Sequence, residues 1–170
     1  MENEHRQLVL IGMMGAGKTS VGRLVAASLG WSFWDNDEAL LQATNKTAAQ
    51  LQHGLGASAL HQTEDRLLRE ALQAREPTVY AAAGSVVLEP EVLNRVPTIW
   101  LRIGAAQEEL NLARSGQYHR PLPHDAAPIL KRLREARADK YERLADAIVD
   151  VASTPQETCD RVIETLKKMT

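Results

Sequence analysis

Cysteine and long apolar runs are scarce in this sequence, and each absence excludes a class of protein. The single cysteine, Cys159, excludes an internal disulfide and fits a reducing compartment. No apolar run approaches the roughly 18 residues that a membrane-spanning helix needs, and the first six residues lack the pattern of a secretory leader. We therefore expect a cytoplasmic protein with no membrane partner.

An excess of charge of one sign is also missing. Twenty basic residues stand against 22 acidic ones, which gives a net charge of −2, so no broad surface for nucleic acid is expected. Repeats, low-complexity tracts and linkers are absent too. With 170 residues, 44% of them apolar, the chain is long enough for one domain, residues 1–170, with its own core. We expect a monomer that acts on a small molecule.

The strongest motif lies near the start, where residues 12–19 read GMMGAGKT. They fit G-x-x-x-x-G-K-[ST], the phosphate-binding P-loop. The glycines let backbone N–H groups approach phosphate oxygens, Lys18 adds a positive charge, and the Thr19 hydroxyl can ligate Mg²⁺. The alternative is a glycine-rich turn with a solvated lysine. The flanking residues indicate a strand before the motif and a helix after it, and this context favours the P-loop.

Strand and helix patterns alternate along the chain. Apolar runs predict five strands, and periodic apolar residues predict helices between them, with Gly30 capping the first helix and Gly54 and Gly56 breaking the second helical stretch. The predicted strands are 8–11, 31–34, 78–82, 96–103 and 147–151, and the helices are 18–29, 38–76, 90–95, 105–114, 126–144 and the segment from 155. This order predicts an α/β fold with a parallel sheet covered by helices on both faces.

Two of the predicted helices carry side chains that need a separate interpretation. Cys159 falls on an apolar stripe of the last helix, so we interpret it as core rather than as a nucleophile. In the second helical stretch Leu60 and Leu68 belong to an apolar face, and the charged residues elsewhere on that helix are expected to lie mostly in solvent; these are Glu64, Asp65, Arg66, Arg69 and Glu70.

Asp35-Asn36-Asp37 follows directly after the predicted second strand. Open α/β sheets bind ligands beyond the carboxyl ends of their strands, and two carboxylates there can serve Mg²⁺ and a substrate hydroxyl in a P-loop protein. The alternative is a polar turn that caps the next helix.

A polar segment at about 115–126 joins two helices and contains a glycine and two prolines. In a P-loop phosphotransferase it favours a lid that carries an arginine, Arg120, over the phosphates, with Arg114 as the second candidate cation. The alternative is a passive loop.

Together these residues resemble the shikimate kinase family along nearly the whole chain. The resemblance rests on residues 12–23 (GMMGAGKTSVGR), Asp35-Asn36-Asp37, Arg120-Pro121-Leu122, and Arg137 with Tyr141 and Ala145. It implies a five-stranded parallel sheet of the nucleoside monophosphate kinase style, a lid, and transfer of the γ-phosphoryl group of ATP, with Mg²⁺, to a hydroxyl of shikimate, a step of aromatic amino acid biosynthesis.

The resemblance also implies roles for single residues. Lys18, Asp37 and Arg120 would be catalytic, with Asp37 accepting a hydrogen bond from the reacting hydroxyl. The ATP site would comprise Gly15, Ala16, Gly17, Lys18, Thr19, Ser20, Arg114, Arg120 and Pro155; the Mg²⁺ site, Thr19 and Asp35; and the acceptor site, Asp37, His61, Gly84 and Arg137.

Two departures from the family fall on the acceptor side. Leu60-His61 stands where the family has Phe-Arg, whose arginine clamps the substrate carboxylate, and Ala83-Gly84-Ser85 replaces three glycines. Loss of a charged hydrogen-bond partner costs about 1.5–3 kcal/mol, roughly ten- to hundredfold in binding. Side chains at positions 83 and 85 would narrow the pocket or stiffen its floor, and Ala83 requires a negative φ. Arg66 or Arg69 is a candidate replacement for the missing cation.

Shikimate is therefore the first candidate acceptor, and other acceptors stay open. One alternative is a related kinase of another polyol or sugar acid. Another is a degenerate kinase that binds nucleotide as a regulatory module, although the presence of Asp37 and Arg120 argues against it. A nucleoside monophosphate kinase fits the motifs less well.

Overall fold

The computed structural model describes residues 6–88, 90–93, 96–114 and 126–170. The described strands are β1 (Gln7–Ile11), β2 (Ser32–Asp35), β3 (Thr78–Ala81), β4 (Thr98–Arg102) and β5 (Ala147–Asp150). The described helices are α1 (Lys18–Leu29), α2 (Asn36–Thr44), α3 (Ala48–Leu55), α4 (Ala57–Ala71), α5 (Ala105–Arg114), α6 (Ala126–Leu144) and α7 (Pro155–Met169), with the short 3₁₀ helices η1 (Gly84–Leu88) and η2 (Pro90–Leu93). All five predicted strands are confirmed, with ends that differ by one or two residues.

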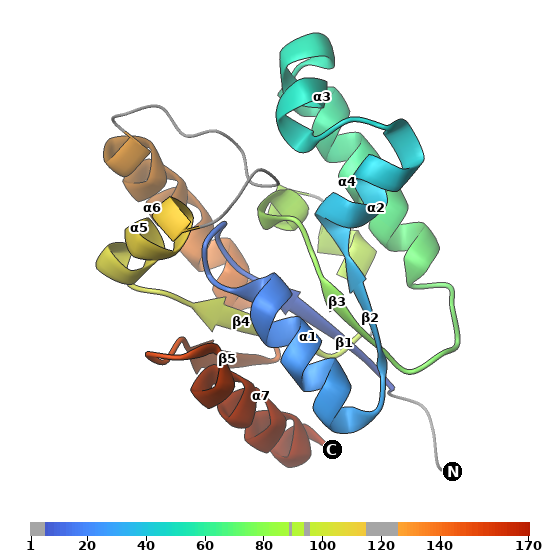
Figure 1. The fold of residues 1–170 in the computed structure, drawn as a ribbon, viewed down its shortest axis with the longest axis vertical. Coiled ribbons are helices and arrows are strands. Elements are labelled where there is room, and N and C mark those ends of the chain that lie inside the picture. The colour runs from blue at the N-terminus through green and yellow to red at the C-terminus, as the bar shows by residue number, and fades with distance from the viewer. Residues whose placement is uncertain (1–5, 89, 94–95, 115–125) are drawn as a thin grey trace.

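The five strands form one parallel sheet in the order β2-β3-β1-β4-β5 (Figure 1). β1 lies at the centre, with Leu8 opposite Val79 of β3 and Leu10 opposite Ile99 of β4. Leu8 and Leu10 are fully buried, as the apolar run of a strand covered on both faces requires. The predicted fold class is therefore confirmed, and the carboxyl ends of the strands meet at one edge of the sheet.

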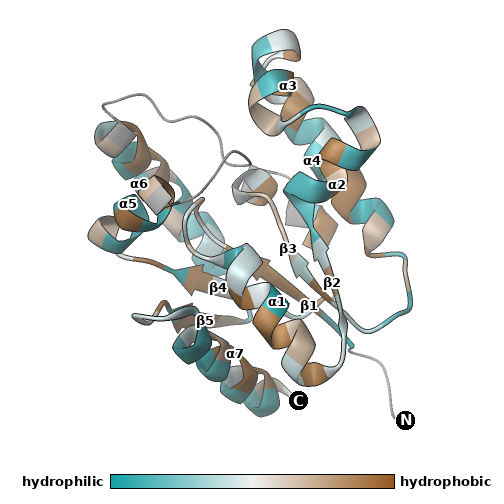
Figure 2. Cartoon of the chain, viewed as in Figure 1, coloured by the Kyte–Doolittle hydropathy of each residue, from teal (hydrophilic) through white to brown (hydrophobic). Residues whose placement is uncertain are grey.

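Helices cover both faces of the sheet. On one face α1 and α7 lie side by side, and their buried residues, among them Val25, Cys159 and Val162, pack on alternate residues of β1 and β4 (Figure 1). Cys159 is fully buried, which confirms its interpretation as core. In Figure 2 the outward side of α7 is mostly hydrophilic, which is the pattern of a helix with one buried stripe.

The second face of the sheet is covered by α4, α6 and η1. The buried side chains there include Leu68 of α4 and Leu130 and Tyr141 of α6, which pack with Tyr80 and Trp100 of the sheet. A smaller apolar cluster joins α2, α3 and α4 beyond β2. This arrangement leaves the edge above β1 and β3 bordered by α2, α4, α5 and α6.

Several helix ends follow the predicted signals. α1 runs from Lys18 to Leu29, and Gly30 ends it with a φ of 67°. α5 and α6 have the predicted bounds. At the start of α7 the Thr154 hydroxyl accepts a hydrogen bond from the Glu157 N–H, and Pro155 occupies the first turn. Along the described part of the chain, no helix combines the length and the apolar character needed to cross a membrane.

The prediction for residues 38–76 was partly wrong. Gly56 does separate two helices, but Gly54 lies inside α3. A further break falls at residues 45–47, where Asn45 has a φ of 55° and the Thr47 side chain accepts a hydrogen bond from the Gln50 N–H to begin α3. An asparagine tolerates the left-handed region and a threonine caps a helix well, so both signals were present in the sequence.

Candidate active site

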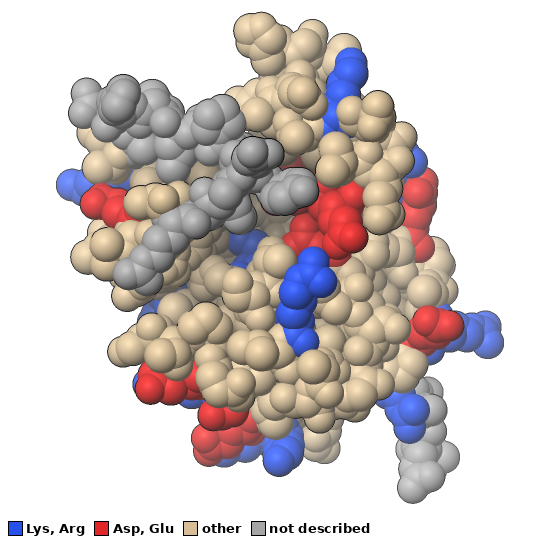
Figure 3. Space-filling model, in the orientation of Figure 1, with Lys and Arg blue, Asp and Glu red and all other residues tan. Residues whose placement is uncertain are grey.

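A cavity of about 400 Å³ opens at the carboxyl ends of the strands. The P-loop follows β1, the start of α2 follows β2, residues 82–84 follow β3, and α5 and residue 153 follow β4 and β5. Its lining residues are Met14, Gly15, Gly17, Lys18, Thr19, Ser20, Asp35, Asn36, Asp37, Glu64, Ala81, Ala82, Ala83, Gly84, Gln107, Asn111, Arg137, Ser153 and Pro155. In Figure 3 acidic side chains gather at the centre of this face, over the start of α2.

The P-loop wraps tightly against α5. Gly15 and Gly17 have φ values of 83° and 88°, which side chains rarely adopt. A Cβ at Gly15 would lie 2.9 Å from Leu112 Cγ, and Asn111 Nδ2 donates a hydrogen bond of 2.8 Å to the Gly15 carbonyl. Gln107 Nε2 in turn donates to Asn111 Oδ1 at 2.9 Å. α5 therefore fixes the middle of the loop through a glycine that no other residue can replace without strain.

Lys18 curls back over the P-loop. Its ammonium donates to the carbonyls of Gly12 at 2.7 Å and Met13 at 2.8 Å. These hydrogen bonds hold the positive charge of Lys18 beside the P-loop. The N–H groups in the first turn of α1 also favour an anion there. The buried Glu108 carboxyl lies near enough for the Lys18 charge to oppose the rise in its pKa that burial causes.

Glu108 also links the two helices that lead into and out of the predicted lid. It is fully buried on α5 and accepts a hydrogen bond from Arg134 of α6. Because of desolvation its pKa is raised, although the Arg134 hydrogen bond and charge act in the opposite direction. This pair joins α5 to α6.

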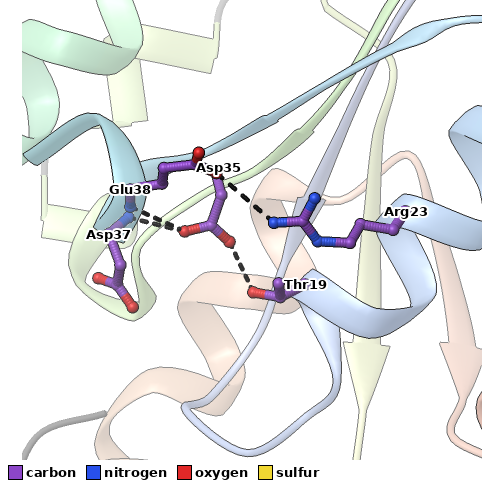
Figure 4. Close-up of polar contacts among 5 residues, drawn as sticks. All are labelled: Thr19, Arg23, Asp35, Asp37 and Glu38. Atoms are coloured by element: carbon purple, nitrogen blue, oxygen red, sulfur yellow. Dashed lines mark hydrogen bonds and ion pairs between the residues drawn. The ribbon is translucent and has the colours of Figure 1, made fainter. Parts of the chain in front are cut away.

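Thr19 and Asp35 meet beside the P-loop (Figure 4). The Thr19 hydroxyl donates to Asp35 Oδ2 at 2.6 Å, while Asp35 Oδ1 accepts from the N–H groups of Asp37 at 2.9 Å and Glu38 at 3.2 Å. One oxygen of Asp35 therefore caps α2, as the alternative interpretation expected, and the other accepts from the P-loop hydroxyl; its role toward Mg²⁺ stays a prediction. A hydroxyl and a carboxylate oxygen are the donors that Mg²⁺ prefers, so this pair fits that ion.

The Thr19–Asp35 pair consists of one hydroxyl and one carboxylate. The described residues contain no group of three or more His, Cys, Asp or Glu side chains arranged around a metal. Mg²⁺ in kinases takes one or two protein ligands and completes its shell with phosphate oxygens and water. Asp37, two residues after Asp35, also lines the cavity. Its carboxylate is separate from that of Asp35 in Figure 4.

Arg137 and Gly84 form the wall opposite α2. Arg137, on α6, is 8% exposed and lines the cavity. A Cβ at Gly84 would lie 3.2 Å from Arg137 Nη1 and 3.5 Å from the Gly12 carbonyl oxygen. The Tyr141 hydroxyl donates to the Gly84 carbonyl at 2.7 Å, and burial raises the pKa of Tyr141 to about 12 although Arg137 opposes that rise. Of the three glycines that the family has at positions 83–85, the one that this chain keeps therefore lies where a Cβ would press against Arg137.

Ser85 and Glu64 form a buried pair behind this wall. The Ser85 hydroxyl donates to Glu64 Oε2 at 2.7 Å, and each residue is 1% exposed. The prediction that the charged residues of this helix lie mostly in solvent holds for Arg66, Arg69 and Glu70 but not for Glu64 and Asp65, which are buried. The Ser85 hydroxyl binds Glu64, which lines the cavity, and Ala83 also lies on the cavity wall; that these side chains narrow the pocket or stiffen its floor stays a prediction.

Ala83 adopts an ordinary backbone conformation. Among the non-glycine residues that the structure describes, only Asn45 has a positive φ. The requirement for a negative φ at Ala83 is thus met, and a methyl group replaces a glycine there without strain.

The remaining predicted site residues are only partly placed. Pro155 lines the cavity from the start of α7, together with Ser153. His61 is half-buried on α4 and is not among the lining residues. Arg66 is exposed and pairs with Glu70 at 2.9 Å. Among described residues the cations that line the cavity are Lys18 and Arg137; Arg120 and residues 115–125 lie outside the described residues, as does the side chain of Arg114.

Five polar or charged lining residues escaped the sequence analysis as site residues. They are Asn36, Glu64, Gln107, Asn111 and Ser153. Asn36 was visible inside the Asp-Asn-Asp motif, and the polar spacing of Gln107 and Asn111 places them on one helix side. Nothing in the sequence indicated that α4 and α5 turn these particular sides toward the cavity.

The fold and this arrangement of P-loop, aspartates and arginine define the class of a P-loop kinase of small molecules. A family model described as shikimate kinase matches residues 14–167. The shikimate kinase of Synechococcus elongatus is 32% identical over 165 residues, which cover 94% of this chain and 85% of the relative. That of Paramagnetospirillum magneticum is 36% identical over 171 residues, with 95% and 84% covered.

The chain belongs to the shikimate kinase family. A solved structure, shikimate kinase from Acinetobacter baumannii in complex with shikimate, matches its fold with a TM-score of 0.90 at 23% identity, over 99% of this chain and 96% of the other. Shikimate kinases use ATP as phosphate donor, so this chain is a kinase of a small molecule.

Proposed function

We propose that this enzyme transfers the γ-phosphoryl group of ATP to a hydroxyl of shikimate and yields shikimate 3-phosphate. The observation that carries the proposal is one cavity that joins a P-loop and a Thr19–Asp35 pair to Asp37 and Arg137. Membership of the family, and the shikimate bound to the Acinetobacter baumannii relative, support this acceptor.

The nucleotide half of the site would bind and neutralise the phosphates. Residues 15–20 offer backbone N–H groups at the start of α1, and Lys18 would leave the loop carbonyls to bind a phosphate oxygen. Thr19 and Asp35 would hold Mg²⁺, which supplies charge neutralisation when bound. Arg114 and Pro155 would flank the adenine, and Arg120 would contact the phosphates from the lid.

The acceptor half would hold the hydroxyl in line for transfer. Asp37 would accept a hydrogen bond from the reacting hydroxyl and orient it as its proton leaves. Arg137, held beside Gly84, would pair with the acceptor carboxylate. His61 of α4, which is not among the lining residues, lacks the fork of an arginine, so we expect weaker carboxylate binding than a two-arginine site gives.

The test is transfer of phosphate to shikimate, measured by ADP release and by mass of the product. Asp37→Asn should lower turnover by about a hundredfold or more, the range of general acid–base catalysis, while ATP affinity stays near the wild-type value. Turnover close to wild type in this variant would remove Asp37 from the mechanism.

A panel of other polyols and sugar acids separates the alternative acceptors. If a member of the panel is turned over faster than shikimate, that compound is the acceptor. Tight ATP binding without phosphate transfer to any acceptor would instead favour a nucleotide-binding regulatory module. We expect a cytoplasmic enzyme that acts as a monomer. Sedimentation of the purified protein tests the oligomeric state.

A further inference from the structure

Asn36 lines the cavity, and neither the fold nor the proposed mechanism has a use for its side chain. It occupies the first position of α2, between Asp35 and Asp37. Its neighbour Asp35 already caps the helix through two backbone N–H groups, so α2 does not need the asparagine side chain. Asn36 nevertheless lines the cavity and is 2% exposed.

The Asn36 amide is buried without hydrogen-bond partners. Among the residues that the structure describes, neither Asn36 Nδ2 nor Asn36 Oδ1 has one. Buried polar side chains are paired in the large majority of cases, and an exception calls for an explanation such as an absent ligand. Here the amide can turn toward the cavity without giving up any bond, so a bound molecule would gain both of its hydrogen-bonding atoms.

The chemistry of the amide selects the kind of group that fits it. An amide offers a donor and an acceptor, and a hydroxyl group is the simplest partner that uses both. A phosphate or carboxylate would use only the donor, and a cation only the acceptor. The nearby charges already have other partners in the mechanism, since Asp37 faces the reacting hydroxyl and Arg137 the acceptor carboxylate.

We propose that Asn36 is a specificity-determining residue that binds a second hydroxyl of the acceptor, the neighbour of the hydroxyl that is phosphorylated. The adjacency rests on two observations, since Asn36 directly precedes Asp37 in the chain and both residues line the same cavity. The site would then select acceptors with two neighbouring hydroxyl groups. This inference rests on the proposed function, in which Asp37 binds the reacting hydroxyl.

The experiment compares Asn36→Leu with the wild type, using shikimate and 4-deoxyshikimate, which lacks the hydroxyl next to the reacting one. We expect the variant to bind shikimate about tenfold more weakly, the value of one net hydrogen bond, with the KM for ATP unchanged. Both proteins should bind 4-deoxyshikimate equally. The melting temperature of the variant should equal or exceed that of the wild type, because no hydrogen bond is lost.

Asn111→Leu is the matched control on the nucleotide side of the same cavity. Its amide is paired with Gly15 and Gln107, so this variant should melt at a lower temperature and raise the KM for ATP, while shikimate binding changes little. The two variants are therefore expected to show opposite changes in melting temperature and in substrate binding. A purely structural role of Asn36 would produce the Asn111 pattern of lost stability.

Three results would overturn the inference: a lower melting temperature of Asn36→Leu, unchanged shikimate affinity, or equal weakening for shikimate and 4-deoxyshikimate. Calorimetry without ATP measures these affinities independently of turnover. If shikimate binds but no phosphate is transferred, the proposed function fails and the inference is still decided by the affinities. If the wild type binds neither compound, both fail.

Discussion

The pair of Ser85 and Glu64 allows a quantitative test of how this chain compensates for a glycine that it has replaced. The change is Ser85→Ala, which removes one hydroxyl and leaves the backbone of η1 unaltered. The hydroxyl donates to Glu64 Oε2 at 2.7 Å, and both residues are 1% exposed. Water therefore does not take the place of the lost donor without a rearrangement of the wall.

The magnitude follows from this burial. A hydrogen bond to a charged group contributes about 1.5–3 kcal/mol, and the loss is borne fully when the remaining partner stays buried. For a chain of this length each kcal/mol shifts the melting temperature by about 2–4 °C. Ser85→Ala should therefore lower the melting temperature by roughly 3–12 °C.

The assay is thermal unfolding of Ser85→Ala beside a control on an exposed serine. Ser58 of α4 is exposed, and Ser58→Ala should change the free energy of unfolding by no more than about 0.5 kcal/mol. A second comparison uses Glu64→Gln as background. In that background Ser85→Ala should lower the free energy of unfolding by a smaller amount, because a hydrogen bond between neutral groups contributes only about 0.5–1.5 kcal/mol.

The outcome that refutes this reasoning is a Ser85→Ala protein as stable as the Ser58→Ala control. It would mean that Glu64 does not depend on the serine hydroxyl, and that the side chain at position 85 only fills space. An equal cost of Ser85→Ala in the wild type and in the Glu64→Gln background would show that the loss comes from packing rather than from the hydrogen bond.

Two further predictions concern the wall that Gly84 and Arg137 form. Gly84→Ala should raise the KM for shikimate several-fold and leave the KM for ATP unchanged in steady-state assays, since the new Cβ would lie 3.2 Å from Arg137 Nη1; equal changes in both KM values would contradict this. The raised pKa of Tyr141, about 12 against 10, contributes stability that is present below pH 10 and lost as the pH rises toward 12, by about 1.4 kcal/mol per pH unit. Tyr141→Phe should therefore flatten the fall of melting temperature above pH 10, though not abolish it, because the pKa of Tyr80 is raised too; an unchanged slope would show that Tyr141 does not cause it.

Much of the fold could be predicted because its signals are local. The apolar run of residues 8–11 requires burial on both faces, and the glycine at position 30 ends α1 where the periodic pattern stops. α5 and α6 have the predicted bounds for the same reason. The error at residues 45–47 has a different origin, since a continuous helix and two helices joined by Asn45 and Thr47 share the same apolar spacing.

The site residues likewise divide into those that local sequence predicts and those that it does not. The P-loop could be identified from sequence because its chemistry depends on residue types at fixed spacing, and the structure places Gly15, Lys18 and Thr19 on one cavity wall. Asp35 followed from its position at a strand end. Glu64 could not be assigned, because a charged residue on an amphipathic helix usually faces water, and only the packing of η1 on α4 buries it beside Ser85.

The sequence by itself therefore determined the parallel α/β fold, the phosphate-binding loop and the family, since each depends on neighbouring residues or on a motif read along the chain. The tertiary structure decided which side chains far apart in the chain share the acceptor wall. It brought Gly84 against Arg137, joined Ser85 to Glu64, and left the Asn36 amide buried without a partner among the described residues. The physical reason is that burial and pairing depend on how helices pack across the sheet, which local spacing does not specify.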